Sequence, residues 1–531
     1  NQATLAQFLL NGGSFTLDLD DDFIMKSGSV IDVSGGKITY EAGFVNTTLV
    51  RTLDNRIIDI READPDELYM GLANEWVQYD VKWGKQRTYF IPFMSSTLGR
   101  YEDGYVQGGA GGKIEILAPD VVLQGTIMGA TTIGKYQRAN QPKGGQFILN
   151  NAGESEGEYV TNNILVAAME QLLPDNFGLT GSLSDVYGGF FGEEYKQGTK
   201  RGQNGRRSDN AMFVGQDFFN RSTMGSYYIR QDGRSDDFAP FPPRAGLAVR
   251  VEAGVNLNLQ HGASFELFAG DRMEFLGSIR TQGGDVDLSG LSLVMGANSR
   301  IDTRGAWFND FERDEAVAIA AVPRIDGGSI SLSATNVGPD LFEDVSLILP
   351  GTMVIDSSGG AWVDRDGTLR AGKAGNLSVG ASIQPTDTLD LSGLANARAY
   401  GLGGNGAYAL ATLAPIVIGN ALGEDQEGAM LLSPDFFARS GFSKISLTAP
   451  SVTIGEGVEV KASSASLVLK VPGLTGGPSY LDYASGTDIY EVAEIGFVPL
   501  EQRPGAHRRG MELNLPGLVM AKGALLSTEL L

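Results

Sequence analysis

The chain of 531 residues contains no cysteine and only two histidines. Without cysteine, no disulfide bond can brace the fold and no thiol can act as a nucleophile or metal ligand. The two histidines, His261 and His507, are far apart in the sequence, so they indicate neither a zinc site nor a Ser-His-Asp triad. A Gly-x-x-x-x-Gly-Lys-Ser/Thr phosphate-binding loop is missing as well. We therefore expect no cofactor.

Basic residues are few compared with acidic ones. The chain has 41 lysines and arginines against 64 aspartates and glutamates, which gives a net charge of −23 at pH 7. Phosphate binding needs clustered basic side chains, so the charge argues against nucleic acid as a partner. The sequence also lacks an apolar run of about 18 residues, the length that a membrane-spanning helix requires. We expect no membrane span.

Glycine, in contrast, is abundant, with 72 residues, well above the usual share of about 7%. In residues 263–305, short runs of alternating apolar and polar residues are separated by Gly, Asn or Asp, which is the pattern of short strands. The side chains expected to face a core are Phe265, Leu267, Met273, Phe275, Ile279, Val286, Leu288, Leu291, Leu293 and Ile301. Those expected to face outward are Glu266, Glu274, Arg280, Asp285, Asp287, Ser292 and Arg300.

One phrase recurs along the chain. Residues 112–127, GKIEILAPDVVLQGTI, are echoed by residues 443–458, SKISLTAPSVTIGEGV, and by residues 328–336, GSISLSATN. An antiparallel sandwich would favour Asn-Gly or Asp-Gly hairpin turns, and residues 263–305 contain neither. Recurrence of a strand unit at about 20 to 25 residues is typical of a solenoid in which each strand pairs with the next coil. The sequence predicts an all-β, right-handed parallel β-helix with loop-rich and short helical insertions.

Breaks in the alternation divide the chain into five segments. Coils are expected at residues 1–37, 106–149 and 246–531, the last with loop excursions. Residues 38–105 form an aromatic-rich insertion, expected to pack its own small core on the rod. Residues 150–245 form a second insertion outside the rod, with an amphipathic helix at residues 160–173 that ends at Pro174.

The two insertions contain the candidate contact residues for a partner or a glycan. Exposed aromatic rings can stack on sugars, although aromatics between Gly and Pro also anchor long loops. The basic glycine-rich stretch at residues 198–207 fits an anionic glycan, or else a solvated loop. The candidates are Trp76, Trp83, Tyr89, Tyr101 and Tyr105 in the first insertion, and Lys200, Arg201, Arg206 and Arg207 in the second.

Paired aspartates raise the possibility of catalysis. Asp285 and Asp287, like Asp364 and Asp366, have the spacing that places two carboxylates on one face of a strand, and a glycosidase needs two such groups. A solvated face of an acidic protein has the same pattern. Calcium is a further possibility at Asp18 and residues 20–22, which are dense in carboxylates.

A block near the amino end resembles a known family. The motifs are GSVIDVSGG at residues 28–36, IDI at 58–60, ADP at 63–65, Trp83-Gly84 and GRYEDGY at 99–105. They are similar to those of the filamentous haemagglutinin family of outer-membrane exoproteins. The resemblance implies a giant secreted β-helical adhesin on the bacterial cell surface, exported by an outer-membrane transporter of the two-partner type. The present chain would be an internal or carboxyl-terminal segment, with other segments of the same exoprotein as partners.

The sequence therefore leads to two functional hypotheses. The first is a structural and adhesive rod segment without catalysis, which serves attachment to a cell surface, matrix or biofilm through a glycan or receptor. The alternative is a polysaccharide-degrading β-helix enzyme, a lyase or glycoside hydrolase, that uses outward-facing aspartate pairs.

Overall fold

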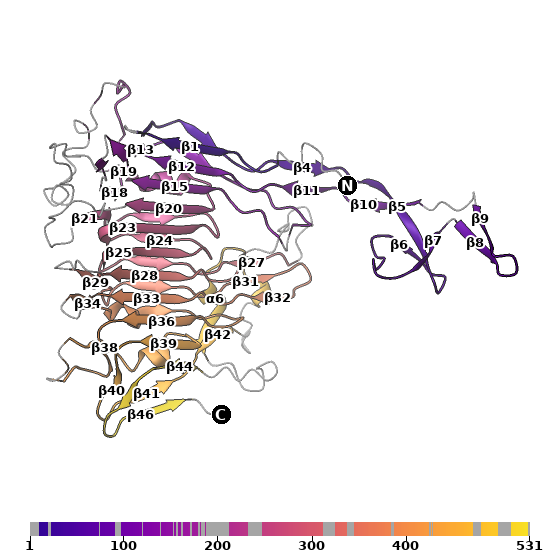
Figure 1. Cartoon of the computed structure of the whole chain (residues 1–531). Helices are drawn as coiled ribbons and strands as arrows, with labels where there is room; N and C mark the ends of the chain where they lie inside the picture. Colours follow the sequence, from indigo (N-terminus) through magenta and orange to yellow (C-terminus); the bar gives the residue numbers. More distant parts are fainter. Residues whose placement is uncertain are drawn as a thin grey trace.

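The computed structural model of the chain consists mainly of β-strands that are stacked along one axis (Figure 1). An 18-stranded sheet is the largest element. The residues that the structure describes are 10–19, 23–73, 75–90, 97–118, 121–137, 140–151, 153–155, 158–160, 163–169, 172–178, 181, 186, 212–231, 247–311, 324–336, 345–383, 387–423, 426, 428–470, 479–496 and 511–528.

The 18-stranded sheet contains two ladders of parallel strands. In the first ladder each strand pairs in parallel with the next strand of the series. The three occurrences of the repeated phrase fall in this one ladder, in β12, β28 and β39. The series is β1 (Ser14–Asp18), β12 (Lys113–Leu117), β15 (Gln146–Asn151), β20 (Ser226–Gln231), β23 (Ser264–Phe275), β25 (Val286–Met295), β28 (Ile330–Thr335), β33 (Leu377–Ser382), β36 (Ala407–Thr412), β39 (Lys444–Thr448) and β44 (Glu512–Asn514).

The second ladder shares β23 and β25 with the first, because the carboxyl-terminal halves of these long strands pair within it, and a register shift separates the two halves of the β23–β25 pairing. Its order is β2 (Phe23–Met25), β13 (Val121–Leu123), β19 (Met212–Gly215), β18 (Ile164–Ala167), β21 (Leu247–Val251), β23, β25, β29 (Ser346–Ile348) and β34 (Thr388–Asp390). A separate parallel sheet contains β38 (Met430–Leu432), β37 (Ile416–Ile418), β40 (Val452–Ile454) and β45 (Leu518–Met520).

A third parallel ladder lies in the same stack of strands. We call the three ladders together the body. The third ladder contains β22 (Asn256–Asn258), β24 (Ser278–Arg280), β26 (Arg300–Asp302), β30 (Val354–Asp356) and β35 (Ala397–Arg398), again in parallel. Two further parallel pairs are β3 (Val30–Asp32) with β14 (Thr126–Met128), and β41 (Glu459–Ala462) with β46 (Leu525–Thr528).

The predicted alternation decides which side chains form the core. Of the ten side chains expected to face inward between residues 263 and 305, all but Leu291 are buried, and they belong to one continuous apolar cluster. Ser292, expected outward, is buried instead. Its hydroxyl lies 2.8 Å from that of Ser346 and accepts a hydrogen bond from the Ser346 amide. Ser292 and Leu293 both face inward because the alternation shifts by one residue within β25.

A column of glycines lies at the corner before the first ladder. Gly284, Gly328, Gly375 and Gly406 occupy this position in four consecutive layers, a layer being one passage of the chain through the stack. A Cβ atom added to Gly328 would lie 2.0 Å from the carbonyl oxygen of Gly284. A Cβ atom added to Gly375 or to Gly406 would lie 2.0 Å from the carbonyl oxygen of the preceding glycine in the column. Only glycine therefore lets the layers approach this closely at the corner.

Two short helices interrupt the strands with the same local sequence. Helix α4 (Gln216–Arg221) contacts β14 and β22, and α5 (Phe436–Arg439) contacts β41 and the 3-10 helix η1 (Ser392–Asn396). Both contain Asp-Phe-Phe-x-Arg-Ser, at residues 217–222 and 435–440, with both phenylalanines buried. The serine hydroxyl that ends each helix donates to the carbonyl of the first phenylalanine. Each motif thus delivers two aromatic rings to the core.

The helix predicted at residues 160–173 is wrong. The chain there forms the end of a small hairpin, β16 (Gly153–Ser155) with β17 (Glu158–Val160), and then strand β18. Ile164 and Val166 enter the main core, while Leu165 and Ala167 pack in a second apolar cluster on the opposite face. An apolar run buried on both faces has no polar side, so its periodicity does not distinguish strand from helix. Within residues 150–245, the described strands β18, β19 and β20 belong to the ladders of the body.

Residues 37–108 form an arm that projects sideways from the body (Figure 1). Its base is the antiparallel pair β4 (Lys37–Tyr40) and β11 (Tyr105–Gly108). Beyond the base lie β5 (Gly43–Thr52), β6 (Ile57–Asp59), β7 (Tyr69–Leu72) and β10 (Thr97–Glu102), then the hairpin of β8 (Glu75–Asp80) and β9 (Lys85–Phe90). Phe44, Leu68 and Val81 are exposed. The described strands of this insertion extend away from the body in Figure 1, whereas the sequence led us to expect packing on the rod.

Residues 479–496 form a strap across the side of the body. The strap contains η2 (Tyr480–Asp482), α6 (Ile489–Val492) and β43 (Ala493–Gly496), which pairs antiparallel with β42 (Ser466–Leu469). Its apolar residues pack on β27 (Trp307–Asn309) and β31 (Ala361–Val363), next to β32 (Leu369–Ala371). Within the described part of the chain, no helix has the length and apolar character needed to cross a membrane.

Candidate functional site

A cleft of about 680 Å³ lies where the arm joins the body, and we call it the aromatic cleft. One wall comes from the end of β10 and the start of β11, and the other comes from the loop between β14 and β15. The volume falls in the range of about 300–1,000 Å³ that is usual for small-molecule sites. The cleft contains two of the aromatic residues that the sequence singled out, Tyr101 and Tyr105.

Three tyrosines form a continuous aromatic surface at the cleft. Tyr40 and Tyr105 are register partners in β4 and β11, and their rings stack with centroids 4.6 Å apart. The ring of Tyr136 meets Tyr105 edge to face at 4.7 Å. Tyr136 is 63% exposed and Tyr101 is 56% exposed, so both offer ring surface to a ligand. Burial raises the pKa of Tyr105, which keeps its phenol protonated.

Polar groups surround the aromatic rings and fix the loop. Arg61 forms ion pairs with Asp59 at 3.0 Å and with Glu102 at 2.9 Å. The side-chain amide of Gln137 donates to the carbonyl of Gly108 at 2.7 Å and accepts from the Gly108 amide at 2.8 Å. These two bonds attach the loop that carries Tyr136 to β11. The cleft thus combines hydrogen-bond donors and acceptors with aromatic ring surface.

The other predicted contact residues lie elsewhere or outside the described residues. Trp83 is 67% exposed at the tip of the β8–β9 hairpin, where the Lys82 ammonium lies 5.5 Å from its ring. Tyr89 is exposed in β9, opposite Trp76, whose side chain lies outside the described part. Lys200, Arg201, Arg206 and Arg207 also lie outside the described residues. Sequence reasoning missed Tyr136, because no local pattern links it to the arm.

The first of the two predicted aspartate pairs, Asp285 and Asp287, lies in different surroundings from the second. Asp285 is exposed and accepts a hydrogen bond from the Ser329 amide at 2.7 Å. Asp287 is partly buried beside Glu266, its register partner in β23, and the two line a groove of about 430 Å³ with hydroxyl side chains. Burial and the nearby Glu266 charge raise the pKa of Asp287. Asp285 lines the same groove, so three carboxylates from two layers face it.

Asp364 and Asp366 do not lie on a strand as expected. They occupy the turn between β31 and β32, where both carboxylates accept from the Thr368 amide at 3.0 Å. Of the calcium candidates, Asp18 ends β1, whereas residues 20–22 lie outside the described part. Among the residues that the structure does describe, no three acidic or histidine side chains gather as a metal ion would require.

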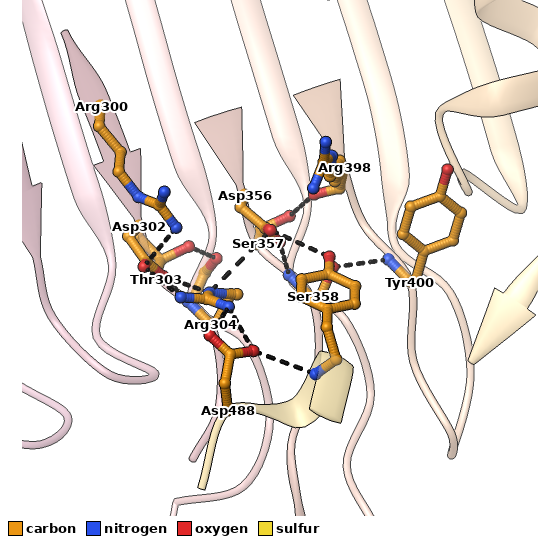
Figure 2. Close-up of polar contacts among 12 residues, drawn as sticks. Arg300, Asp302, Thr303, Arg304, Asp356, Ser357, Ser358, Arg398, Tyr400 and Asp488 are labelled. Atoms are coloured by element: carbon orange, nitrogen blue, oxygen red, sulfur yellow. Dashed lines mark hydrogen bonds and ion pairs between the residues drawn. The ribbon is translucent and has the colours of Figure 1, made fainter. Parts of the chain in front are cut away.

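A buried polar cluster connects the body to the strap, and Arg304 is at its centre (Figure 2). The guanidinium pairs with Asp302 at 2.8 Å and contacts both carboxylate oxygens of Asp488 at 2.8 and 2.9 Å. Asp302 also pairs with Arg300 at 3.0 Å. The side chains of Arg304 and Asp302 are only 13% and 6% exposed. One buried arginine thus links β26 to the start of α6.

Tyr490 makes the second link between the strap and the body. Its hydroxyl donates to Asp356 at 2.9 Å and lies 2.9 Å from the Ser358 hydroxyl. Ser358 in turn accepts from the Tyr400 amide at 3.1 Å. Burial raises the pKa of Asp356, although Ser358 and Arg304 oppose this effect. The carboxylates of this cluster all bind cations or hydrogen-bond donors, an arrangement that attaches the strap.

Acid is expected to loosen the strap. Burial alone would raise the pKa values of Asp302 and Asp488, but the hydrogen bonds and the Arg304 charge hold both below the ordinary value of 3.8. A carboxylate with a lowered pKa stabilises the fold above its unfolded-state pKa, and this stabilisation is lost as the pH falls through the folded value. Asp356, with its raised pKa, offsets part of the loss. Tryptophan fluorescence near Trp307 should therefore change between about pH 5 and pH 2, and a flat profile would contradict the prediction.

Searches of protein-family models, curated proteins and solved structures found no match to this chain.

Proposed function

We propose that this chain is a structural and adhesive rod segment of a large secreted bacterial surface exoprotein, with a right-handed parallel β-helix as its body. The parallel first ladder from β1 to β44 supports a β-helix, because strands that follow one another at intervals pair side by side. A stack of this kind grows along one axis and holds its projections away from the surface that carries it. The body would act as the spacer.

The aromatic cleft at the base of the arm is the observation that supports adhesion. Tyr101, Tyr105 and Tyr136 present ring faces and edges in one concave site, and aromatic faces pack against the apolar face of a sugar ring. Arg61, Glu102 and Gln107 line the same site and can hydrogen-bond to hydroxyls. We therefore propose a cell-surface or matrix glycan as the ligand.

The resemblance to filamentous haemagglutinin exoproteins supports the proposed location and partners. The segment would stand on the bacterial cell surface after passage through an outer-membrane transporter, joined to other segments of the same exoprotein. The net charge of −23 is consistent with an exposed protein that avoids side-by-side association. A polysaccharide-degrading enzyme is the second candidate, and the groove with Glu266 and Asp287 favours it.

Glycan binding by the full chain tests the proposal. Replacing Tyr136 by alanine should weaken binding to a responsive glycan about tenfold or more, because a central aromatic anchor contributes roughly 2 kcal/mol. Tyr79→Ala is the matched control, since Tyr79 is 64% exposed in the distal hairpin. Binding would be measured on a glycan array and then by calorimetry.

Three results would count against adhesion at this cleft. They are the absence of any bound glycan, equal binding by the Tyr136→Ala variant, and a loss in the Tyr79→Ala control of the same size. Release of new reducing ends from a polysaccharide, abolished in Asp287→Asn, would favour the enzyme instead.

A further inference from the structure

A second cleft, of about 230 Å³, lies on the third ladder beside the strap, and we call it the Arg280 cleft. Arg280 ends β24, and Gln282 follows in the turn to β25. Phe308 in β27 and Asp488 in the strap form other parts of the wall. The Arg280 cleft shares no lining residue with the aromatic cleft, so the inference below does not depend on the proposed function.

Arg280 differs from the arginines around it. Its side chain is exposed and has no ion pair or hydrogen bond with the described residues, whereas Arg300 and Arg304 on the next layer are both paired. Its register partner in β26 is Asp302, but Arg300 and Arg304 already bind that carboxylate. The planar guanidinium therefore has donors available for a ligand, and its geometry matches a carboxylate.

The turn beside Arg280 is held in a costly conformation. Gln282 has a φ of 50°, in the left-handed region, and is one of two such non-glycine residues in the described part. Its carbonyl accepts a hydrogen bond from the Gly262 amide at 3.1 Å, which holds the turn against the preceding layer. Backbone strain of this kind tends to occur at binding sites. Here it places an amide side chain in the wall of the cleft.

The remaining wall suits a ring with several hydroxyl groups. The imidazole of His261 packs edge-on against Phe308 with centroids 5.2 Å apart. Desolvation by the surrounding wall, together with the nearby Arg324 charge, lowers the pKa of His261 and favours the uncharged ring, although the residue as a whole is exposed at the edge of the cleft. The Arg324 backbone already takes one hydrogen bond of this ring, which leaves one ring nitrogen for a ligand. Thr487 and Asp488 supply further oxygens on the side of the strap. The Phe308 ring adds the apolar contact.

These features together define the chemistry of the ligand. Arg304 and Asp488 also line the cleft, but they are paired with each other, so Arg280 is the charge in this lining that still calls for a negative partner. The amide, imidazole and hydroxyl groups call for neutral polar partners. The volume lies below the range of about 300–1,000 Å³ for drug-sized ligands, which suits one sugar ring rather than a chain. We propose that the Arg280 cleft binds a single carboxylate-bearing sugar residue of the uronic acid class, with Arg280 as the partner of the carboxylate.

Titration of the full chain with glucuronate and galacturonate tests the inference, with glucose, galactose and acetate as comparison ligands. One of the two acidic sugars should bind, and its neutral counterpart and acetate should bind at least about tenfold more weakly. Arg280→Gln should weaken the acidic sugar about 10- to 100-fold, because hydrogen bonds to a charged group contribute about 1.5–3 kcal/mol. Since Arg280 is exposed, this substitution should leave the fold unchanged, as circular dichroism would verify.

Two control variants separate this site from general charge effects and from the aromatic cleft. Arg87→Gln removes the same charge at an exposed position of the arm and should not change binding. Tyr136→Ala should leave the acidic sugar bound while it weakens the glycan of the aromatic cleft. The inference is overturned if neither acidic sugar binds, if acetate binds as tightly as the sugar, or if Arg280→Gln retains full affinity.

Discussion

Alanine in place of Gly328 is expected to lower the free energy of unfolding of the body by about 3 kcal/mol, the upper end of the usual cost of overpacking. The added Cβ would lie 2.0 Å from the carbonyl oxygen of Gly284 and 2.5 Å from its carbonyl carbon. Both contacts are with backbone atoms, which cannot rotate away. Two neighbouring layers must therefore separate, which weakens the parallel hydrogen bonds between β25 and β28.

Gly13 provides a matched control for this substitution. Gly13 occupies the same column, below Gly112, but a Cβ added there meets no described heavy atom within 4 Å. Gly13→Ala should therefore be close to neutral. The measurement is the midpoint of urea unfolding, together with hydrogen exchange of the amides in β25 and β28. Equal midpoints for the two variants would show that the layers have more freedom than the column implies.

Replacement of Arg304 by methionine is expected to cost about 3 kcal/mol, the lower end of the usual cost of about 3–5 kcal/mol for removing one partner of a buried pair. The lower end applies because Asp302 keeps Arg300 as a partner and Asp488 is 40% exposed. Asp302 and Asp488 would lose the cation that they share, and Asp356 would lose a positive charge 4.0 Å away. The strap should detach before the ladders unfold. Hydrogen exchange and limited proteolysis of residues 479–496 would record the change.

Arg370→Met is the control for this substitution, and a double variant tests its cause. Arg370 is 56% exposed and lies 3.7 Å from Asp364, so its loss should change stability by no more than about 0.5 kcal/mol. Adding Asp302→Asn to Arg304→Met should restore part of the lost stability, since one buried charge is removed. A strap that remains protected in Arg304→Met would mean that Tyr490 and apolar packing are sufficient to hold it.

The fold could be predicted from the sequence wherever the chain repeats its own local pattern. The alternation of apolar and polar residues identified the buried side of β23 and β25. The segments that repeat the sequence of β12 lie in the same ladder as β12. Alternation is a property of neighbouring residues, so it can be recognised in the sequence without knowledge of the tertiary structure. It failed at β18, where both faces are buried, and within β25, where a shift of one residue turns Ser292 inward.

The sites were harder to predict because they join distant parts of the sequence. Arg304 meets Asp488 across 184 positions, and Tyr136 meets Tyr105 through a separate loop. Neither pair has a spacing that could be recognised in the chain. The two Asp-Phe-Phe-x-Arg-Ser motifs, in contrast, were visible in the sequence and could have marked the two places where a helix replaces a strand.

The position of β19 has a consequence for the order in which the chain can assemble. In the second ladder β19 lies between β13 and β18, although it follows β18 in the sequence. A chain that folds progressively from its amino end reaches β18 before the strand that must separate it from β13. Until β19 is available, the facing edges of β13 and β18 either stay unpaired or pair with each other. In the second case, β19 must later replace that pairing. The edge of β18 that faces β13 therefore lacks its native partner until residues 212–215 are available to form β19.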